Sequence, residues 1–275
     1  MHSGVGSVDD RTMGRIVWVI RHGDRFDFEE GKEAWEARDP VQLNDPVLSQ
    51  LGRKQAVQTA EEVLEASARL GRPVERVITS PFVRCIETSN CIAELTGCDL
   101  LVDFSLFEVV YTTEQFPSLA ERRRYFPRID VNYDSLPRPA EDESFPTQAI
   151  ARYAASAKAL TERFPGKNLV LCSHAAGVSA IVASLLRVTV EEVGPVHPAS
   201  LFCLEEAEEG VYKVVGDMCG SIRHFKQPLG KTLPWPRLGE CEDDTWGAMW
   251  IKTGNAENAP WPISASGGGD SKMPL

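Results

Sequence analysis

The sequence predicts an α/β fold in which a mostly parallel central sheet carries helices on both faces. Short runs rich in β-branched residues alternate with segments of helical periodicity. The first strand-like runs are mostly apolar, as is typical of parallel strands buried on both sides. The 275 residues are enough for one large α/β domain with a sizeable core. A lid-like insert and a late β-hairpin are expected to depart from the alternation.

Five short runs are expected to form strands. Residues 15–20, 76–79 and 168–172 are short runs rich in β-branched and other apolar residues and predict buried strands. Residues 200–204 and 211–215 flank an acidic turn that contains glycine, which is typical of a β-hairpin.

Helices are expected between these strands. Apolar residues recur at helical spacing within 56–67, opposite a polar face. Ser80-Pro81 predicts a helix start, because serine caps free amides and proline has no amide to leave unpaired at the first helical position. Gly97 is expected to end that helix. Two further helices are expected at 148–163 and 177–186.

Three segments lie outside this alternation. Residues 111–147 form a long, mixed, proline-containing stretch and predict a cap insert beside a site, within a domain spanning 15–229. The arginine run at 122–124 is expected to be a solvated helix face. Residues 1–14 are small and polar and predict a flexible N-terminus. Residues 230–275 lack periodicity and predict a C-terminal extension that is partly disordered.

Composition excludes several classes of function. The 29 basic and 40 acidic residues give a net charge of −11, which disfavours binding to nucleic acid or to anionic membranes. No apolar run is long enough to span a bilayer, and the first residues do not form a secretory leader. The seven cysteines form no C-x-x-C pair, so no disulfide framework or zinc site is indicated. We therefore expect a cytoplasmic protein without a metal site, whose affinity for phosphate comes from a local basic pocket.

That pocket is predicted where the buried strands end. The carboxyl ends of parallel strands meet at one crevice, where ligands bind in open α/β sheets. Arginine suits phosphate because its fork of donors matches two oxygens at once, and the amides that open the helix at Ser80 add a positive field. The residues expected to converge there are Arg21, His22, Arg25, Arg84 and His174.

His22 is the candidate nucleophile of this pocket. It lies between Arg21 and Arg25, whose charges disfavour the imidazolium form and leave one ring nitrogen with a free lone pair. The other nitrogen is expected to donate to a backbone carbonyl, that of Gly23.

Glu108 is the candidate acid for the leaving group. It is a lone carboxylate in the apolar run 106–109, and an apolar setting is expected to raise its pKa. It could then donate a proton and later deprotonate an attacking water. A neighbouring carboxylate, Glu114, is the alternative.

Four short motifs occur in order along the chain: Arg21-His22-Gly23-x-Arg25, Ser80-Pro81-x-x-Arg84-x-x-x-Thr88, Leu106-Phe107-Glu108 and Ser173-His174-Ala175. Together they resemble the histidine phosphatase (phosphoglycerate-mutase-like) superfamily, and the likeness runs from about residue 15 to about residue 215. Within it, the chain is most similar to the phosphatase domains of the suppressor of T-cell receptor signalling proteins and of ecdysteroid-phosphate phosphatase. The stretches that carry this likeness are 81–85, 106–108, 143–145 and 202–206.

The resemblance implies a two-step phosphoryl transfer without metal or cofactor. His22 takes the phosphoryl group, Glu108 protonates the leaving group, and water then releases phosphate. The equatorial oxygens would be held by Arg21, Arg25, Arg84 and His174. The substrate would be a phosphotyrosine-like phosphoprotein or a small phosphorylated metabolite or steroid, and the resembling domains imply a homodimer.

Departures from the family patterns favour hydrolysis. The phytase branch has an aspartate after the second histidine, where this chain has Ala175, so Glu108 must act as the acid. The mutases have an asparagine where this chain has Phe28. A phosphoglycerate-type mutase and a non-catalytic phosphate-binding scaffold remain the alternatives. Aromatic residues of the insert would suit an aromatic or steroid leaving group, namely Tyr111, Phe116, Tyr125 and Phe126.

Overall fold

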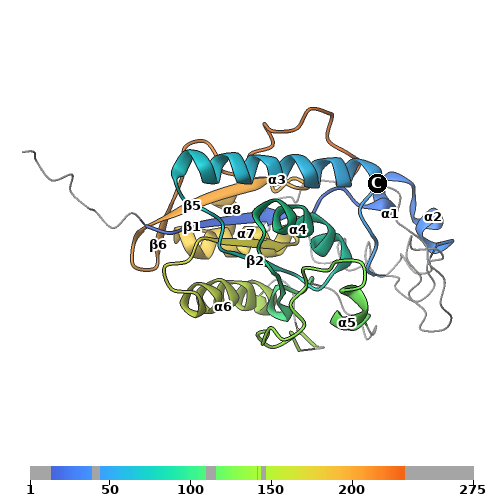
Figure 1. The fold of residues 1–275 in the computed structure, drawn as a ribbon, viewed down its shortest axis with the longest axis horizontal. Helices are drawn as coiled ribbons and strands as arrows, with labels where there is room; N and C mark the ends of the chain where they lie inside the picture. Colours follow the sequence, from blue (N-terminus) through green and yellow to red (C-terminus); the bar gives the residue numbers. More distant parts are fainter. Residues whose placement is uncertain (1–13, 39–43, 110–115, 141, 144–146, 233–275) are drawn as a thin grey trace, which may run out of the picture.

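The computed structural model describes residues 14–38, 44–109, 116–140, 142–143 and 147–232 (Figure 1). Within these residues, one six-stranded sheet has the order β3-β2-β4-β1-β5-β6. Neighbours among the first four strands run parallel, and β5 and β6 are antiparallel additions at one side. The strands are β1 (Ile16–Arg21), β2 (Arg76–Thr79), β3 (Leu100–Val102), β4 (Leu169–Ser173), β5 (Leu201–Glu208) and β6 (Val211–Val214). The predicted mostly parallel sheet and late hairpin are confirmed.

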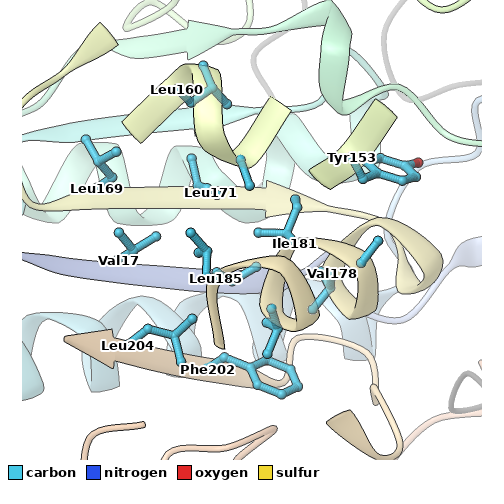
Figure 2. Packing of buried hydrophobic residues seen from close by; sticks show 14 of the residues in the cluster. Val17, Tyr153, Leu160, Leu169, Leu171, Val178, Ile181, Leu185, Phe202 and Leu204 are labelled. Carbon is cyan, nitrogen blue, oxygen red and sulfur yellow. The ribbon is translucent and has the colours of Figure 1, made fainter. Parts of the chain in front are cut away.

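Helices cover both faces of the sheet, as the sequence predicts. Alternate residues of β1 point to opposite faces, because successive side chains of a strand alternate. Trp18 and Ile20 pack in a core that includes residues of α3 (Gln50–Leu70) and α4 (Val83–Thr96). Val17 packs in a second core (Figure 2), which includes residues of α6 (Thr147–Arg163) and α7 (Ala175–Leu186). The short helices are α1 (Phe26–Glu29), α2 (Lys32–Glu36), η1 (Phe104–Leu106), α5 (Leu119–Arg122) and α8 (Val190–Val193).

The strand register brings the catalytic candidates to one edge of the sheet. Arg21 pairs with Ser173 across β1 and β4, and Thr79 pairs with Cys172 across β2 and β4. The three strands therefore end level with one another. The loops that follow them carry His22, Ser80 and His174 to the same place.

The start of α4 differs from the prediction. Its N-cap is Phe82, so Ser80 and Pro81 lie before the helix. The Ser80 hydroxyl lies 2.8 Å from Nε2 of His174 and caps no amide of α4. The predicted end is confirmed, because Gly97 closes α4 with φ of 76°, a left-handed conformation that favours glycine.

The described part of the insert packs more closely on the domain than an open lid would. Phe126 is buried in the core that contains α4, which corrects the prediction that its ring faces a leaving group. Tyr125 is half-buried and packs against the same core. Of the arginine run, Arg123 and Arg124 are exposed as expected, but Arg122 is buried, so the expectation of a solvated side chain is wrong for that residue. Tyr111 and both terminal extensions lie outside the described residues, apart from 14 and 230–232. No helix in the described residues is both long and apolar enough to cross a membrane.

Candidate active site

The structure brings all six predicted site residues to the carboxyl edge of the sheet. Arg21 ends β1, and His22 and Arg25 follow it. Arg84 lies in the first turn of α4, and His174 is the N-cap of α7. All six are at most 8% exposed: Arg21, His22, Arg25, Arg84, Glu108 and His174.

His22 is held with one ring nitrogen available. Its Nδ1 lies 2.8 Å from the carbonyl oxygen of Gly23, which only accepts, so Nδ1 carries the proton and Nε2 has the lone pair. The pKa of His22 is held well below its usual value by burial, and then by the charges of Arg84 and Arg21. The sequence-based expectation of a neutral imidazole bonded to Gly23 agrees with this geometry.

The loop that carries His22 is fixed by two motif residues. The hydroxyl of Thr88 accepts a hydrogen bond from the Gly23 amide at 3.1 Å, and donates to the carbonyl of Arg84. A Cβ on Gly23 would lie 2.6 Å from the carbonyl oxygen of Gly52 in α3, so the backbones approach too closely for a side chain. This contact explains the glycines at both positions.

Arg84 is a fully buried cation with an unused donor. Its Nη2 lies 3.2 Å from Nδ1 of His174 and 3.4 Å from Oε2 of Glu108. Its guanidinium stacks 4.4 Å from the ring centroid of Phe82. Its Nε has no hydrogen-bond partner among the described residues. A buried donor on a positive group is suited to an anion.

The other two arginines differ in how their charge is balanced. Arg21 donates from Nη1 to the carbonyl of Val196, and burial is the main cause that lowers its pKa to about 9. Arg25 forms a two-pronged contact with Asp27, at 3.0 and 2.6 Å, and stacks over Phe28. Phe28, which replaces the asparagine of the mutases, therefore supports an arginine.

Glu108 differs from the prediction in its charge state. Its Oε2 lies 3.0 Å from Nδ1 of His174, and its Oε1 accepts from the Val109 amide. Burial raises the pKa of Glu108, but His174 and Arg84 outweigh it and hold the pKa well below its usual value. The predicted rise is wrong for the unliganded site, because polar groups from distant elements surround the carboxylate. Glu114, the alternative acid, lies outside the described residues.

His174 is a neutral partner of this carboxylate. Burial lowers its pKa to about 4, since the opposing effect of Glu108 is smaller. Its Nε2 is held by Ser80. Ser80 is predicted to cap a helix, because its neighbour Pro81 is typical of a helix start; only the fold shows that it contacts His174.

The same residues offer donor atoms to a cation. One nitrogen each of His22 and His174 and one oxygen of Glu108 lie within 4.8 Å of one another, the only such group found in the part of the chain that the structure describes. The buried guanidiniums of Arg21 and Arg84 lie beside it and repel a cation. The charge balance therefore favours an anion.

The carboxyl group of Glu87 in α4 holds the neighbouring loop. Its buried setting leads us to expect that the stability of the protein depends on pH. Its carboxylate accepts from the Leu48 amide at 2.6 Å and pairs with Arg53, and burial raises its pKa from 4.5 to about 7. Between pH 4.5 and about pH 7, Glu87 keeps its proton in the folded protein but has lost it in the unfolded chain. The free energy of unfolding should therefore fall by up to about 3 kcal/mol as pH rises through this window.

Glu87→Gln should remove that fall, measured by urea unfolding at pH 5 and pH 8. Glu61→Gln, which changes an exposed carboxylate of α3, is the matched control and should keep it. An identical pH dependence in wild type and Glu87→Gln would contradict the assignment.

Comparisons with known proteins give a consistent result. The model of the histidine phosphatase superfamily (branch 1) matches residues 17–216. The probable phosphoglycerate mutase GpmB of Escherichia fergusonii is 29% identical over 174 residues, which cover 62% of this chain and 74% of that protein. The protein of the same name from Salmonella typhi is also 29% identical over 174 residues, with the same coverage.

Two solved structures share the fold. The ecdysone phosphate phosphatase from Bombix mori, in complex with tungstate, superposes with a TM-score of 0.57 at 20% identity, covering 75% of this chain and 94% of that one. A mycobacterial glucosyl-3-phosphoglycerate phosphatase superposes with a TM-score of 0.50 at 21% identity, covering 76% of this chain and 99% of that one.

Proposed function

Because the chain belongs to the histidine phosphatase superfamily, we propose that it hydrolyses phosphomonoesters through a phosphohistidine formed on His22. The observation that carries the proposal is the state of that imidazole. It is buried and neutral, and its Nδ1 donates its proton to Gly23. Among the described residues its Nε2 has no hydrogen-bond partner, and the charge of Arg84 acts on the ring. A nucleophile and a phosphate-binding cation are thus already in place before substrate arrives.

In the first step Nε2 of His22 attacks phosphorus, and the bond from phosphorus to the ester oxygen breaks. The Nδ1 proton stays on the ring, donated to Gly23. Arg21 and Arg84 stabilise the negative charge that builds on the equatorial oxygens of the phosphoryl group. Arg25 lies nearby and adds its positive charge to the same pocket. The leaving oxygen takes a proton from Glu108.

Glu108 takes up that proton from solvent when substrate binds, and returns it to solvent when phosphate leaves. In the unliganded site, His174 and Arg84 keep the carboxylate ionised. A bound phosphoryl dianion competes for both partners and adds negative charge beside Glu108. Both effects raise the pKa of the carboxyl, so substrate binding itself prepares the acid.

In the second step a water molecule attacks phosphorus and loses its proton to Glu108. The bond from phosphorus to Nε2 breaks, which releases inorganic phosphate and regenerates neutral His22. The acid of the first step is the base of the second, so one carboxyl group serves both.

The substrate is proposed to be a phosphotyrosine-like phosphoprotein or a small phosphorylated metabolite or steroid. The net charge of −11 argues against nucleic acid as substrate. A phosphoglycerate-type mutase is the second candidate, favoured by the names of the relatives at 29% identity. Transfer of the phosphoryl group between hydroxyls, measured against release to water, separates the two.

The proposal predicts metal-independent turnover. The purified protein should release phosphate from p-nitrophenyl phosphate at the same rate before and after treatment with EDTA. Rapid quenching with a labelled substrate should trap a phosphoenzyme that is labile in acid, as a phosphoramidate is. Loss of activity in EDTA that zinc restores would instead assign His22, Glu108 and His174 to a metal site.

A further inference from the structure

A buried carboxylate joins the insert to the phosphate pocket. Asp45 is 3% exposed and lies on the segment before α3. Its Oδ2 lies 2.7 Å from Nη2 of Arg122, and its Oδ1 lies 3.7 Å from Nη1 of Arg84. Oδ1 also accepts from the Val83 amide at 2.7 Å, at the start of α4. Asp45 thus contacts one arginine of the pocket and one of the insert.

The two distances are unequal, and the difference decides what Asp45 does. Its short, charge-assisted contact is with Arg122, whereas Arg84 stays beyond hydrogen-bond distance. Arg84 instead donates through Nη1 to the carbonyl of Asn44, and its Nη2 lies beside His174. Arg122 therefore occupies a carboxylate that would otherwise draw Arg84 away from the site.

The position of Arg122 is itself well defined. It is the last residue of α5, whose first turn is closed by a capping box between Ser118 and Glu121. Its guanidinium lies 5.7 Å from the ring centroid of Phe116, which packs at 4.9 Å on Phe82. Phe82 in turn stacks under Arg84. An ion pair and a row of rings both connect α5 to the same guanidinium.

We propose that Asp45 and Arg122 are positioning residues, and that the insert helix α5 sets the affinity of the pocket for phosphate by keeping Asp45 from capturing Arg84. The inference rests on the proposed function only in that Arg84 binds phosphate. Arg122 touches no reacting atom in this scheme. Its effect passes through Asp45, and removing Asp45 should cancel it.

The test measures the dissociation constant of inorganic phosphate by calorimetry, which needs no turnover. Arg122→Met should weaken binding by about tenfold, because the unpaired Asp45 then draws Arg84 toward itself. Arg122→Lys keeps a cation on Asp45 and should bind within about threefold of wild type. Arg123→Met, at the exposed C-cap that follows α5, is the matched control and should leave binding unchanged.

The double variant Asp45→Asn/Arg122→Met decides between positioning and a general loss of structure. Asparagine keeps an acceptor for the Val83 amide but carries no charge to attract Arg84. Phosphate affinity should return to within about threefold of wild type, and KM for p-nitrophenyl phosphate should recover with it. If Arg122→Met does not fold, equal affinities for Asp45→Asn and the double variant give the same support.

Two results would overturn the proposal. One is wild-type affinity in Arg122→Met, and the other is a double variant that binds as weakly as Arg122→Met or more weakly. Failure of the proposed function gives a different result, since wild type would then bind phosphate with the expected dependence on Arg122 but release none from esters.

Discussion

Replacing His22 with alanine should lower kcat/KM for p-nitrophenyl phosphate by about 10⁴-fold or more, because the variant lacks the imidazole on which the covalent intermediate is proposed to form. The phosphoenzyme trapped by rapid quenching should disappear with the activity. The neighbouring His174 cannot replace His22, since its Nδ1 lies against Glu108 and its Nε2 against Ser80.

Two control measurements show whether the loss of activity in His22→Ala comes from loss of the nucleophile rather than from loss of the fold. His22→Ala should still bind inorganic phosphate, because Arg21 and Arg84 remain, and that binding shows that the fold is intact. His224→Ala removes an imidazole that contacts Thr59 and should change kcat/KM by less than about threefold. Undiminished turnover in His22→Ala, or an adduct stable in acid, would identify a different nucleophile.

Glu108→Gln should have an effect that depends on the leaving group. For an alkyl phosphate, whose alcohol must be protonated as it leaves, kcat/KM should fall by about 10²–10⁴-fold. For p-nitrophenyl phosphate the fall in kcat/KM should be much smaller, because nitrophenolate leaves without a proton and kcat/KM does not include the second step, in which Glu108 acts as the base. Glutamine keeps the shape of the side chain, so the contrast between the two esters reports the proton alone.

The matched variant is Glu114→Gln, which removes the alternative carboxyl group. It should affect both esters equally and weakly if Glu108 is the acid. Equal losses for both esters in Glu108→Gln would show that the carboxylate positions Arg84 and His174 and donates no proton.

The sheet was predictable where its strands are long and apolar enough to stand out. β1, β2 and β4 each contain a short run of consecutive apolar residues, and the hairpin of β5 and β6 has an acidic turn that contains glycine. β3 was not predicted, because its three residues lie between Asp99 and Asp103 and show no period. Short strands of this kind are defined by their pairing with a neighbour, which the sequence does not display.

The membership of the site was predictable, but its electrostatics were not. Parallel topology alone places the residues that follow β1, β2 and β4 together. The pKa of Glu108 depends on His174 and Arg84, whereas the sequence shows only its apolar neighbours along the chain. Arg122 could not be distinguished from Arg123, because α5 has only four residues and no readable periodicity.

The place of β1 in the sheet has a consequence for how the chain is made. Trp18 is paired with Val170 on one side and with Cys203 on the other, so this strand emerges from the ribosome long before either partner. The apolar side chains of its first five residues must stay shielded during that interval, and such distant pairings make folding slow. We expect nascent chains that end before β4 to depend on chaperones, and translation pauses there to favour aggregation over the native sheet.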